Sequence, residues 1–376
     1  MKILFTGGGT GGHFYPIIAV AEEIQNIALE RNLVTPSLYY VGPEPYDERI
    51  LFEKGVEYKQ SPAGKIRRYP SLKNFFDLFK TAIGLLKSLW ILFFIYPDVV
   101  FSKGGYTTFP VTLAARILRI PVVVHESDAV AGRANIFAGK FATKIAIAYP
   151  DAAKYFPGKE VAYFGNPVRD AIKRPATEGA HEYLKLDKEV PTLLIMGGSQ
   201  GSQAINEVVM RALPQLVLKY QVIHQTGEAH VEEIKITSSV ILEKSEHKER
   251  YKAFGYLNDL ALRMAVGASA LIISRAGSGA IFEIAMWGKP AILIPIPDQV
   301  SRDQRKNAFS FARSGAAIVI EEHNLTPNVF IAEVNRLMDD ETRRATMGEA
   351  AKKFAKPNAA RAIAEGIVNV ALGHER

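Results

Sequence analysis

Residues 2–16 read KILFTGGGTGGHFYP: a short apolar run, a loop with five glycines, and the beginning of a helical pattern. Glycine allows the backbone to approach a ligand closely and to adopt positive φ angles. Exposed N–H groups at the start of the following helix, together with the helix dipole, form a site for an anion. The stretch therefore predicts a strand–loop–helix unit of a parallel sheet, with a loop suited to a diphosphate.

Two further loops of this kind lie between a predicted strand and a predicted helix, GGSQGS at 197–202 and SRAGSG at 274–279. One such loop can merely tighten a turn, but three of them favour ligand binding. The spacing Gly7-x-Gly9-x-x-Gly12 also fits a dinucleotide loop, which needs an acidic residue about 20 positions later. Glu44 and Asp47 come later than that, and none of the three loops ends in the Gly-Lys-Ser/Thr of a phosphate-binding ATPase loop.

Outward from these loops, apolar runs alternate with helical patterns in two series, as in doubly wound α/β domains. Strands are predicted at 2–5, 37–41, 99–102, 121–125, 143–148 and 161–164, then at 192–196, 222–225, 251–254, 271–274, 291–294 and 317–320. Helices are predicted at 16–31, 107–118, 204–218, 257–266, 279–286 and 303–314, with Pro16 in a first turn.

The length of 376 residues fits two domains. We expect Rossmann-like domains at 1–170 and 171–356 facing across a cleft, with the polar segment 175–189 as a linker and a C-terminal helix at about 357–376 crossing back onto the first domain. Ligands of such sheets bind beyond the carboxyl ends of the strands.

Composition limits the chemistry of the protein. The absence of cysteine excludes disulfides, thiolate metal sites and thiol nucleophiles. A net charge of +7 and a pI of about 9.2 fit an anionic ligand, an anionic membrane surface or nucleic acid. The longest uninterrupted apolar run, 89–96, has eight residues, whereas a membrane-spanning helix needs about 20. A cytoplasmic protein, soluble or peripheral on the membrane, is expected.

Segment 64–90 combines basic and apolar residues. Six basic residues (Lys65, Arg67, Arg68, Lys73, Lys80 and Lys87) oppose one acid, Asp77. Lys73, Asp77, Lys80, Gly84 and Lys87 recur at helical spacing, and the other faces carry Phe75, Phe76, Phe79, Leu85, Leu86 and Leu89. The pattern fits a peripheral helix on anionic lipid, or an ordinary helix packed on the sheet with a solvated basic edge. The chain has no known base-reading module, so nucleic acid is not an expected partner.

His13 follows the first glycine loop at the beginning of a helix. The positive end of the helix disfavours imidazolium, so the pKa of His13 should be lowered and the neutral base favoured. A histidine that only packs at the turn would explain the same position.

Seven motifs occur in order: GGGTGGHFYP (7–16), GGYTTFP (104–110), HESD (125–128), GNPVR (165–169), GGSQGS (197–202), SRAGSGAIFE (274–283) and DQRKNA (303–308). Together they resemble the MurG family of N-acetylglucosaminyltransferases of peptidoglycan synthesis. The resemblance implies a GT-B fold and an inverting, metal-independent transfer without a cofactor. The donor would be UDP-N-acetylglucosamine, bound mainly by the second domain. The acceptor would be the C4 hydroxyl of a lipid-linked muramoyl-pentapeptide, bound by the first domain at an anionic membrane surface, with other cell-wall synthesis proteins as possible partners.

Residue roles follow from the matching motifs. For the donor, the resemblance implies Ser199 at the diphosphate, Glu283 at the ribose diol, the backbone of Leu257 at uracil, Gln304 at the sugar, and contacts from Arg169, Thr10, Gly11, Gly12 and Asp128. For the acceptor it implies His13 as general base, with Tyr106 and Asp128. Asp128 stands where many members have asparagine, and an ionised carboxylate accepts hydrogen bonds but does not donate them.

Glu283 capping a helix and Arg169 pairing with Asp170 or another acid are the plain alternatives for those two residues. Two other functions fit the same architecture. The first is a UDP-sugar 2-epimerase, which would need neither a lipid nor the basic apolar segment. The second is a non-catalytic subunit that binds a nucleotide sugar or a dinucleotide.

Overall fold

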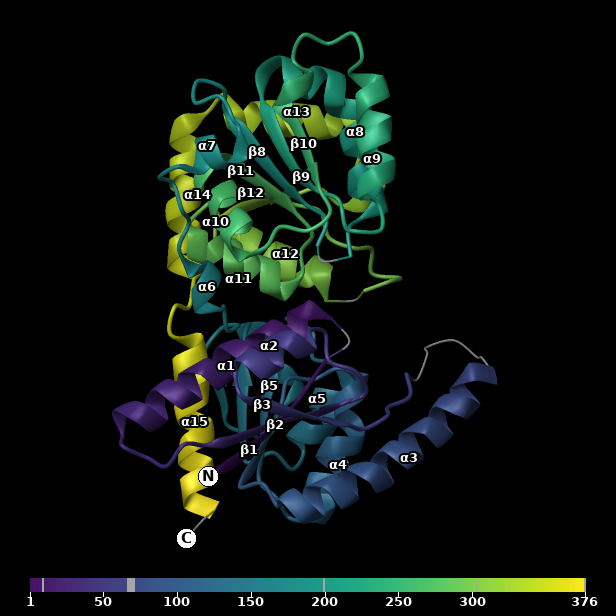
Figure 1. Ribbon diagram of the computed structural model, residues 1–376, viewed down its shortest axis with the longest axis vertical. Coiled ribbons are helices and arrows are strands. Elements are labelled where there is room, and N and C mark those ends of the chain that lie inside the picture. Colours follow the sequence, from purple (N-terminus) through teal and green to yellow (C-terminus); the bar gives the residue numbers. More distant parts are fainter. Residues whose placement is uncertain (9, 66–71, 199, 302, 375–376) are drawn as a thin grey trace. The chain divides into compact units, whose positions relative to one another are not determined.

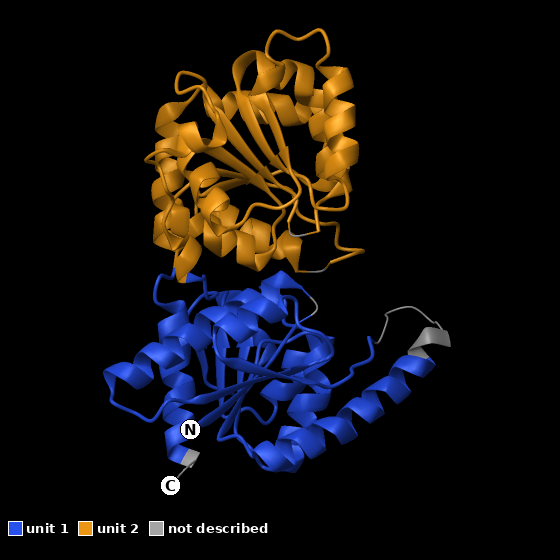
Figure 2. Ribbon diagram, in the orientation of Figure 1, with its two compact units in different colours: residues 1–169, 356–376 blue, residues 170–355 orange. Residues whose placement is uncertain are grey.

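The computed structural model describes residues 1–8, 10–65, 72–198, 200–301 and 303–374, with the side chains of 72–74 and 374 excepted. The chain forms two compact units (Figure 2). Unit 1 comprises residues 1–169 and 356–376, and unit 2 comprises residues 170–355. Segment 175–189, expected as a linker, lies within unit 2 and contains the short helix α7, Ala180–Leu184.

Within the described residues, unit 1 contains a seven-stranded parallel sheet in the order β3-β2-β1-β4-β5-β6-β7. Its strands are β1 Lys2–Thr6, β2 Ser37–Gly42, β3 Val56–Gln60, β4 Val99–Ser102, β5 Val122–Glu126, β6 Lys144–Ile147 and β7 Val161–Tyr163. Its helices are α1 Gly11–Glu30, α2 Glu48–Glu53, α3 Leu72–Ile95, α4 Phe109–Ile117, α5 Arg133–Gly139 and α15 Ala359–His374, with 3-10 turns at Tyr106–Thr108 and Pro150–Tyr155.

The central strands of this sheet are buried on both faces, which is why their sequences are continuous apolar runs. One face is covered by α1 and α15, whose side chains join those of β1, β2 and β4 in one core. The other face is covered by α3, α4 and α5, which form a second core. Both faces of the unit 1 sheet are therefore covered by helices (Figure 1).

In unit 2 the described residues form a six-stranded parallel sheet in the order β10-β9-β8-β11-β12-β13. Its strands are β8 Thr192–Met196, β9 Gln221–Gln225, β10 Tyr251–Phe254, β11 Ser269–Ser274, β12 Ala291–Leu293 and β13 Ala317–Val319. The remaining helices are α6 Asp170–Lys173, α8 Gln203–Lys219, α9 Val231–Ile241, α10 Asp259–Ala268, α11 Ser278–Trp287, α12 Gln304–Arg313, α13 Pro327–Met338 and α14 Glu341–Phe354, with 3-10 turns at Lys248–Arg250 and Glu322–Asn324.

Each sheet has a point where the strand order reverses, between β1 and β4 in unit 1 and between β8 and β11 in unit 2. Loops leave such a switch point in opposite directions and open a crevice beyond the carboxyl ends of the two strands. The predicted fold class, two doubly wound parallel α/β domains, is confirmed.

The structure differs from the sequence prediction at the start of the first helix. Helix α1 begins at Gly11, so the last two glycines of the loop are helical and Pro16 lies inside the helix rather than in its first turn. Six strands and α-helices were not predicted at all: α2, β3, α5, α6, α7 and α9. Strand β3 is an edge strand with only Val56 buried, so its sequence lacks the apolar run by which the other strands were recognised.

Helix α3 has apolar residues on its exposed face as well as on its packed face. Its Gly84 lies against the carbonyl of Pro62, and the Ser88 hydroxyl is 2.8 Å from that of Ser61. Its exposed face is apolar, with nine side chains 56–71% exposed: Phe75, Phe76, Leu78, Phe79, Ile83, Leu86, Trp90, Phe93 and Phe94. The helix packs on the unit 1 core through Ile91 and Leu92, and it also exposes an aromatic face that an ordinary packed helix would not have.

The same helix bears on the expectation that no segment spans a membrane. Phe75–Ile95 is long and apolar enough to cross a bilayer, with a mean hydropathy of 1.8. Length and composition alone are weak evidence for a crossing, since core helices of soluble proteins also have them. Lys65, Lys80 and Lys87 are exposed in this region, whereas Arg67, Arg68 and the Lys73 side chain lie outside the described residues.

Candidate functional site

In unit 1, the sheet register brings three of the predicted motifs together. Thr6 at the end of β1 lies beside Ser102 at the end of β4, and Ser102 lies beside Val124 of β5. The first glycine loop, the Lys103–Tyr106 loop and the HESD segment therefore emerge side by side at one edge of the sheet. Because this edge is the switch point, it is where a doubly wound sheet binds its ligand.

His13 lies in the first turn of α1 and is half-buried. Its Nδ1 is 3.2 Å from the hydroxyl oxygen of Thr10. Its other ring nitrogen, Nε2, faces the loop after β4. A methyl group added to Gly105 of that loop would lie 3.9 Å from His13 Nε2. Desolvation, reinforced by the positive charge of Lys103, lowers the pKa of His13 to about 4. The imidazole is neutral at physiological pH, as a general base must be.

The HESD segment is held by its own glutamate. Glu126 accepts hydrogen bonds from the backbone N–H of Asp128 at 2.9 Å and of Gly132 at 2.9 Å, and from the Asn135 amide at 3.0 Å. Its neighbour His125 is buried, and its Nε2 is 2.9 Å from the carbonyl oxygen of Gly165. Since a carbonyl only accepts, Nε2 carries the proton. These bonds fix the backbone that carries Asp128 and tie it to the GNPVR motif.

The other predicted residues of unit 1 differ in exposure. Tyr106 is 40% exposed, and Thr10 and Gly12 are also exposed, whereas Asp128 is half-buried and Gly11 is buried. Arg169 is only 8% exposed, and its guanidinium carbon lies 3.8 Å from the centre of the Tyr15 ring. This stacking gives Arg169 a cation–π contact with α1. The structure thus places Arg169 in unit 1, at the end of the GNPVR motif.

In unit 2, the second and third glycine loops are brought together in the same way. Met196 at the end of β8 lies beside Ser274 at the end of β11, and the loops that follow lead into α8 and α11. At Gly201, φ is +77° and a side chain would collide with the Thr226 carbonyl, so only glycine fits. Ser199, predicted at the donor diphosphate, lies outside the described residues.

Gln225, at the end of β9, connects the second glycine loop to Leu257 and was not predicted from the sequence. Its side-chain amide donates to the carbonyl of Gly198 at 3.2 Å, and its oxygen accepts from the Leu257 N–H at 3.3 Å. The Leu257 backbone, predicted to read uracil, is thereby fixed relative to the loop predicted to hold the diphosphate. A glutamine at the end of a strand has no motif of its own, and only the order β10-β9-β8 reveals this role.

Glu283 and Gln304 both belong to helices that begin at this edge of the unit 2 sheet. Glu283 is half-buried in the interior of α11, so it does not cap α11 itself. Gln304 is the first residue of α12, and its side-chain oxygen accepts from the N–H of Ile296 at 3.2 Å. A Cβ on Gly277 would be 3.9 Å from the Gln304 amide nitrogen, so α12 starts beside the third glycine loop.

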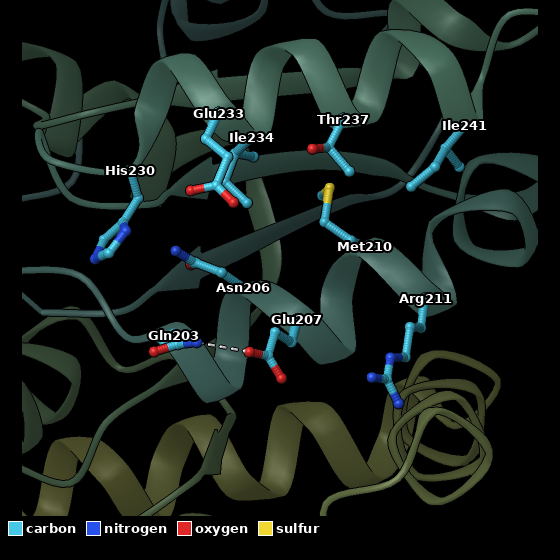
Figure 3. Close-up of a pocket in the computed structure, with 10 residues that line it drawn as sticks. All are labelled: Gln203, Asn206, Glu207, Met210, Arg211, His230, Glu233, Ile234, Thr237 and Ile241. Atoms are coloured by element: carbon cyan, nitrogen blue, oxygen red, sulfur yellow. Dashed lines mark hydrogen bonds between the residues drawn. The ribbon is translucent and has the colours of Figure 1, made fainter.

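A pocket of about 450 Å³ lies between α8 and α9 of unit 2 (Figure 3). Side chains of the two helices face each other across it, and Gln203 donates to Glu207 at 2.9 Å. The ten described residues that line it include none of those predicted from the sequence. In the described part of the chain, no group of three or more His, Asp or Glu side chains is placed to hold a metal ion.

Residues 3–147 match the N-terminal domain of glycosyltransferase family 28, and residues 192–363 match its C-terminal domain. A UDP-N-acetylglucosamine–N-acetylmuramyl-(pentapeptide) pyrophosphoryl-undecaprenol N-acetylglucosamine transferase of Bacillus cereus is 38% identical over 338 residues, covering 89% of this chain and 91% of that one. The crystal structure of Acinetobacter baumannii MurG superposes with a TM-score of 0.73 at 26% identity, covering 98% and 99% of the two chains.

A UDP-N-acetylglucosamine 2-epimerase of Neisseria meningitidis, solved with UDP-N-acetylglucosamine, reaches a TM-score of 0.67 over 98% of this chain and 100% of that one. Its identity is 16%, so it shares the fold alone. Both family 28 domains are matched in order, and the sequence similarity is to the transferase. The chain therefore belongs to the MurG family of N-acetylglucosaminyltransferases, within glycosyltransferase family 28.

Proposed function

We propose that this protein transfers N-acetylglucosamine from UDP-N-acetylglucosamine to the C4 hydroxyl of undecaprenyl-diphospho-muramoyl-pentapeptide, a step of peptidoglycan synthesis. The observation that carries the proposal is the 38% identity, over most of both chains, to a relative named for this reaction. The geometry supports it, since each parallel sheet presents glycine loops at its switch point, where diphosphate-containing ligands are bound.

Unit 2 provides the donor side. The loops after β8 and β11 offer backbone N–H groups and helix N-termini to the diphosphate of UDP. The carboxylate of Glu283 suits the ribose diol, because it presents two acceptor oxygens. Leu257, held by Gln225, would read uracil through its backbone, and Gln304 would contact the sugar.

Unit 1 provides the acceptor side, with Tyr106 and Asp128 near His13. With a proton on Nδ1 shared with Thr10, His13 Nε2 is free to accept the proton of the C4 hydroxyl. That oxygen then attacks the anomeric carbon from the face opposite UDP, and the bond to the diphosphate oxygen breaks as the new bond forms. The N–H groups and helix dipoles of the unit 2 loops stabilise the charge that develops on UDP.

The membrane position of the protein rests on α3. Its exposed aromatic face, together with Lys65, Lys80 and Lys87, has the composition of a helix that lies in the interface of an anionic bilayer. The packing of Gly84 and Ser88 on residues 61–62 supports a helix lying on the membrane rather than crossing it. The enzyme would thus be peripheral on the cytoplasmic face, within reach of a lipid-linked acceptor.

Vesicle sedimentation tests the membrane position. Phe76→Ser with Phe79→Ser should reduce binding to vesicles of any charge. Lys80→Gln with Lys87→Gln should reduce it only where anionic lipid is present, by about 1 kcal/mol per lysine. Phe52→Ser, at a residue 85% exposed on α2, is the matched control. Equal vesicle binding by all four proteins would contradict the proposal.

The reaction is tested with radiolabelled UDP-N-acetylglucosamine and the lipid-linked acceptor. Label should pass to the lipid with the wild-type protein and with His323→Ala, an exposed histidine of unit 2, but at least about 100-fold more slowly with His13→Ala. The donor alone is incubated in parallel. Epimerised sugar there, with no transfer to lipid, would replace the transferase by the 2-epimerase. Binding of UDP with neither reaction would leave the non-catalytic subunit.

A further inference from the structure

Lys103 is a buried lysine at the end of β4 that no motif singled out. It is only 1% exposed, and its ammonium donates to the Ser127 hydroxyl and, at 3.1 Å, to the side-chain oxygen of Asn166. Lysine is almost never fully buried unless it is paired, because desolvation of its charge is costly. A buried ammonium with two side-chain acceptors from two other loops indicates a specific function for this charge.

Lys103 also contacts the first glycine loop. Its backbone N–H donates to the carbonyl of Thr6 at 2.9 Å, and a Cβ on Gly7 would lie 2.9 Å from its own Cβ. Ser127 follows β5, and Asn166 follows β7. The Lys103 side chain therefore joins the loops after β5 and β7, which carry the HESD and GNPVR motifs, while its backbone joins them to the end of β1, which leads to His13.

The ionisable groups around Lys103 come from β5, the segment just after it, and α1. Asp128 and Glu126 of the β5 end attract its positive charge, and His125 of β5 and His13 of α1 feel that charge. Burial lowers the pKa of Lys103 to about 8, so it is predominantly cationic at neutral pH. The positive charge of Lys103 therefore interacts with two acidic residues and two neutral histidines.

We propose that Lys103 is a positioning residue for the transfer reaction: its ammonium holds the loops after β5 and β7 in one arrangement and places a buried positive charge beside His13, balanced by Glu126 and Asp128. This inference rests on the proposed function, and it deepens it by adding a residue that does not touch substrate. An ammonium 1% exposed and bonded to Ser127 and Asn166 acts through its neighbours rather than on a ligand.

The test replaces the charge but keeps the length of the side chain. In Lys103→Met, kcat should fall about 10- to 100-fold, because small misplacements of catalytic groups have effects of that size. The Kd of UDP, measured by calorimetry, should not change, since the donor loops belong to unit 2. The pKa of His13, followed by NMR of 15N-histidine-labelled full-length protein and assigned with His13→Gln, should rise from about 4 towards its usual value.

Lys289→Met is the matched control. Lys289 is a half-buried lysine of unit 2 whose ammonium donates to the carbonyl of Ser269 at 2.6 Å. Like Lys103→Met, the Lys289→Met protein should unfold at a lower temperature than the wild type. Unlike Lys103→Met, it should keep the wild-type kcat and the wild-type pKa of His13. A folded Lys103→Met protein with normal kcat and an unmoved His13 pKa overturns the inference.

Ser127→Ala removes one acceptor of Lys103 and keeps the test decisive if Lys103→Met does not fold. It should lower kcat and leave the Kd of UDP unchanged, and a normal kcat in this variant would then overturn the inference. The NMR readout separates the two proposals. If the wild-type protein transfers no sugar, the proposed function fails, whereas the His13 pKa in Lys103→Met still reports whether the charge acts on His13.

Discussion

In the proposed mechanism, the Thr10 hydroxyl sets which nitrogen of His13 acts as the base. The two groups are 3.2 Å apart, and a general base at Nε2 requires the proton on Nδ1. If Thr10 accepts that proton in a hydrogen bond, its removal costs about 1 kcal/mol of preference for the productive tautomer. Thr10→Val should therefore lower kcat about 5- to 10-fold, measured at saturating donor and acceptor, with little change in the Kd of UDP.

Thr10→Ser is the control, because it keeps the oxygen and removes only a methyl group. It should retain most of the wild-type kcat. Equal losses in Thr10→Ser and Thr10→Val would assign the effect to packing of the loop instead of to the tautomer of His13.

His224 gives unit 2 a predictable response to acid. It is buried in β9 with Nδ1 2.9 Å from the Tyr251 hydroxyl, and desolvation lowers its pKa to about 3. The unfolded chain binds a proton near pH 6.5, whereas the folded chain does not until far lower pH. The stabilisation is therefore complete above pH 6.5, and it is lost as the pH falls towards 3, by at most about 1.4 kcal/mol per pH unit.

The measurement uses Trp287, which is buried in unit 2 and donates to the Ile172 carbonyl at 2.7 Å. The chain has two tryptophans, so Trp90→Phe leaves Trp287 as the only tryptophan, whose fluorescence can be excited selectively. Urea unfolding between pH 7 and pH 4 should show a free energy of unfolding that falls more steeply with His224 than with His224→Asn. Parallel curves for the two proteins would contradict the assignment.

At this scale the sequence revealed motifs but not their connections. His13 could be named because it follows a glycine loop, and Glu283 and Leu257 because they stand in segments that resemble the family; the pKa of His13 is lowered as predicted. The cause differs in part, since burial and Lys103 lower it rather than the helix end alone. Lys103 and Gln225 could not be found, because their partners are 24 to 63 residues away along the chain and meet only through the strand order.

At the scale of elements, two helical glycines should respond oppositely to alanine. Glycine in a helix is ordinarily about 1 kcal/mol less favourable than alanine. Gly84 of α3 is an exception, because a Cβ there would collide with the Pro62 carbonyl. Gly366 of α15 has no atom within 4 Å of that position. Gly84→Ala should therefore destabilise unit 1, and Gly366→Ala should stabilise it by about 0.5–1 kcal/mol.

Thermal unfolding of the two variants, followed by circular dichroism, checks the signs. If Gly84→Ala raised the melting temperature as much as Gly366→Ala, the close packing of α3 on residues 61–62 would be refuted. The pair is informative because both substitutions make the same chemical change in the same unit.

The elements themselves could be predicted where burial dictates sequence. Buried central strands such as β4, β8 and β11 must be continuously apolar, and their predicted bounds agree with the structure within two residues. Edge strand β3 and the surface helices α2 and α9 face solvent over much of their surface, so their sequences are mixed. The orientation of α3 could not be predicted, because its exposed face breaks the rule that apolar residues face the core.

At the scale of the whole molecule, the chain crosses between its units twice. Unit 1 is discontinuous, since α15 returns to it and contributes Ile363, Ala364, Ile367, Val368 and Ala371 to the core formed by α1 and the sheet. Unit 2 has its own core, which includes Leu337 of α13. A cavity made by a large-to-small substitution in either core lowers the free energy of unfolding by about 2–5 kcal/mol. Only the unit that contains that core should be destabilised.

Ile367→Ala and Leu337→Ala form a matched pair for this prediction, because both remove a fully buried branched side chain from a helix. Hydrogen exchange read by mass spectrometry should show faster exchange in β1, β4 and α1 for Ile367→Ala, with β8 and β11 unchanged. Leu337→Ala should show the reverse. Equal acceleration of exchange in both sheets by either variant would mean that the whole chain unfolds as one cooperative unit. The last 21 residues, which belong to unit 1, would then contribute to the stability of unit 2 as well.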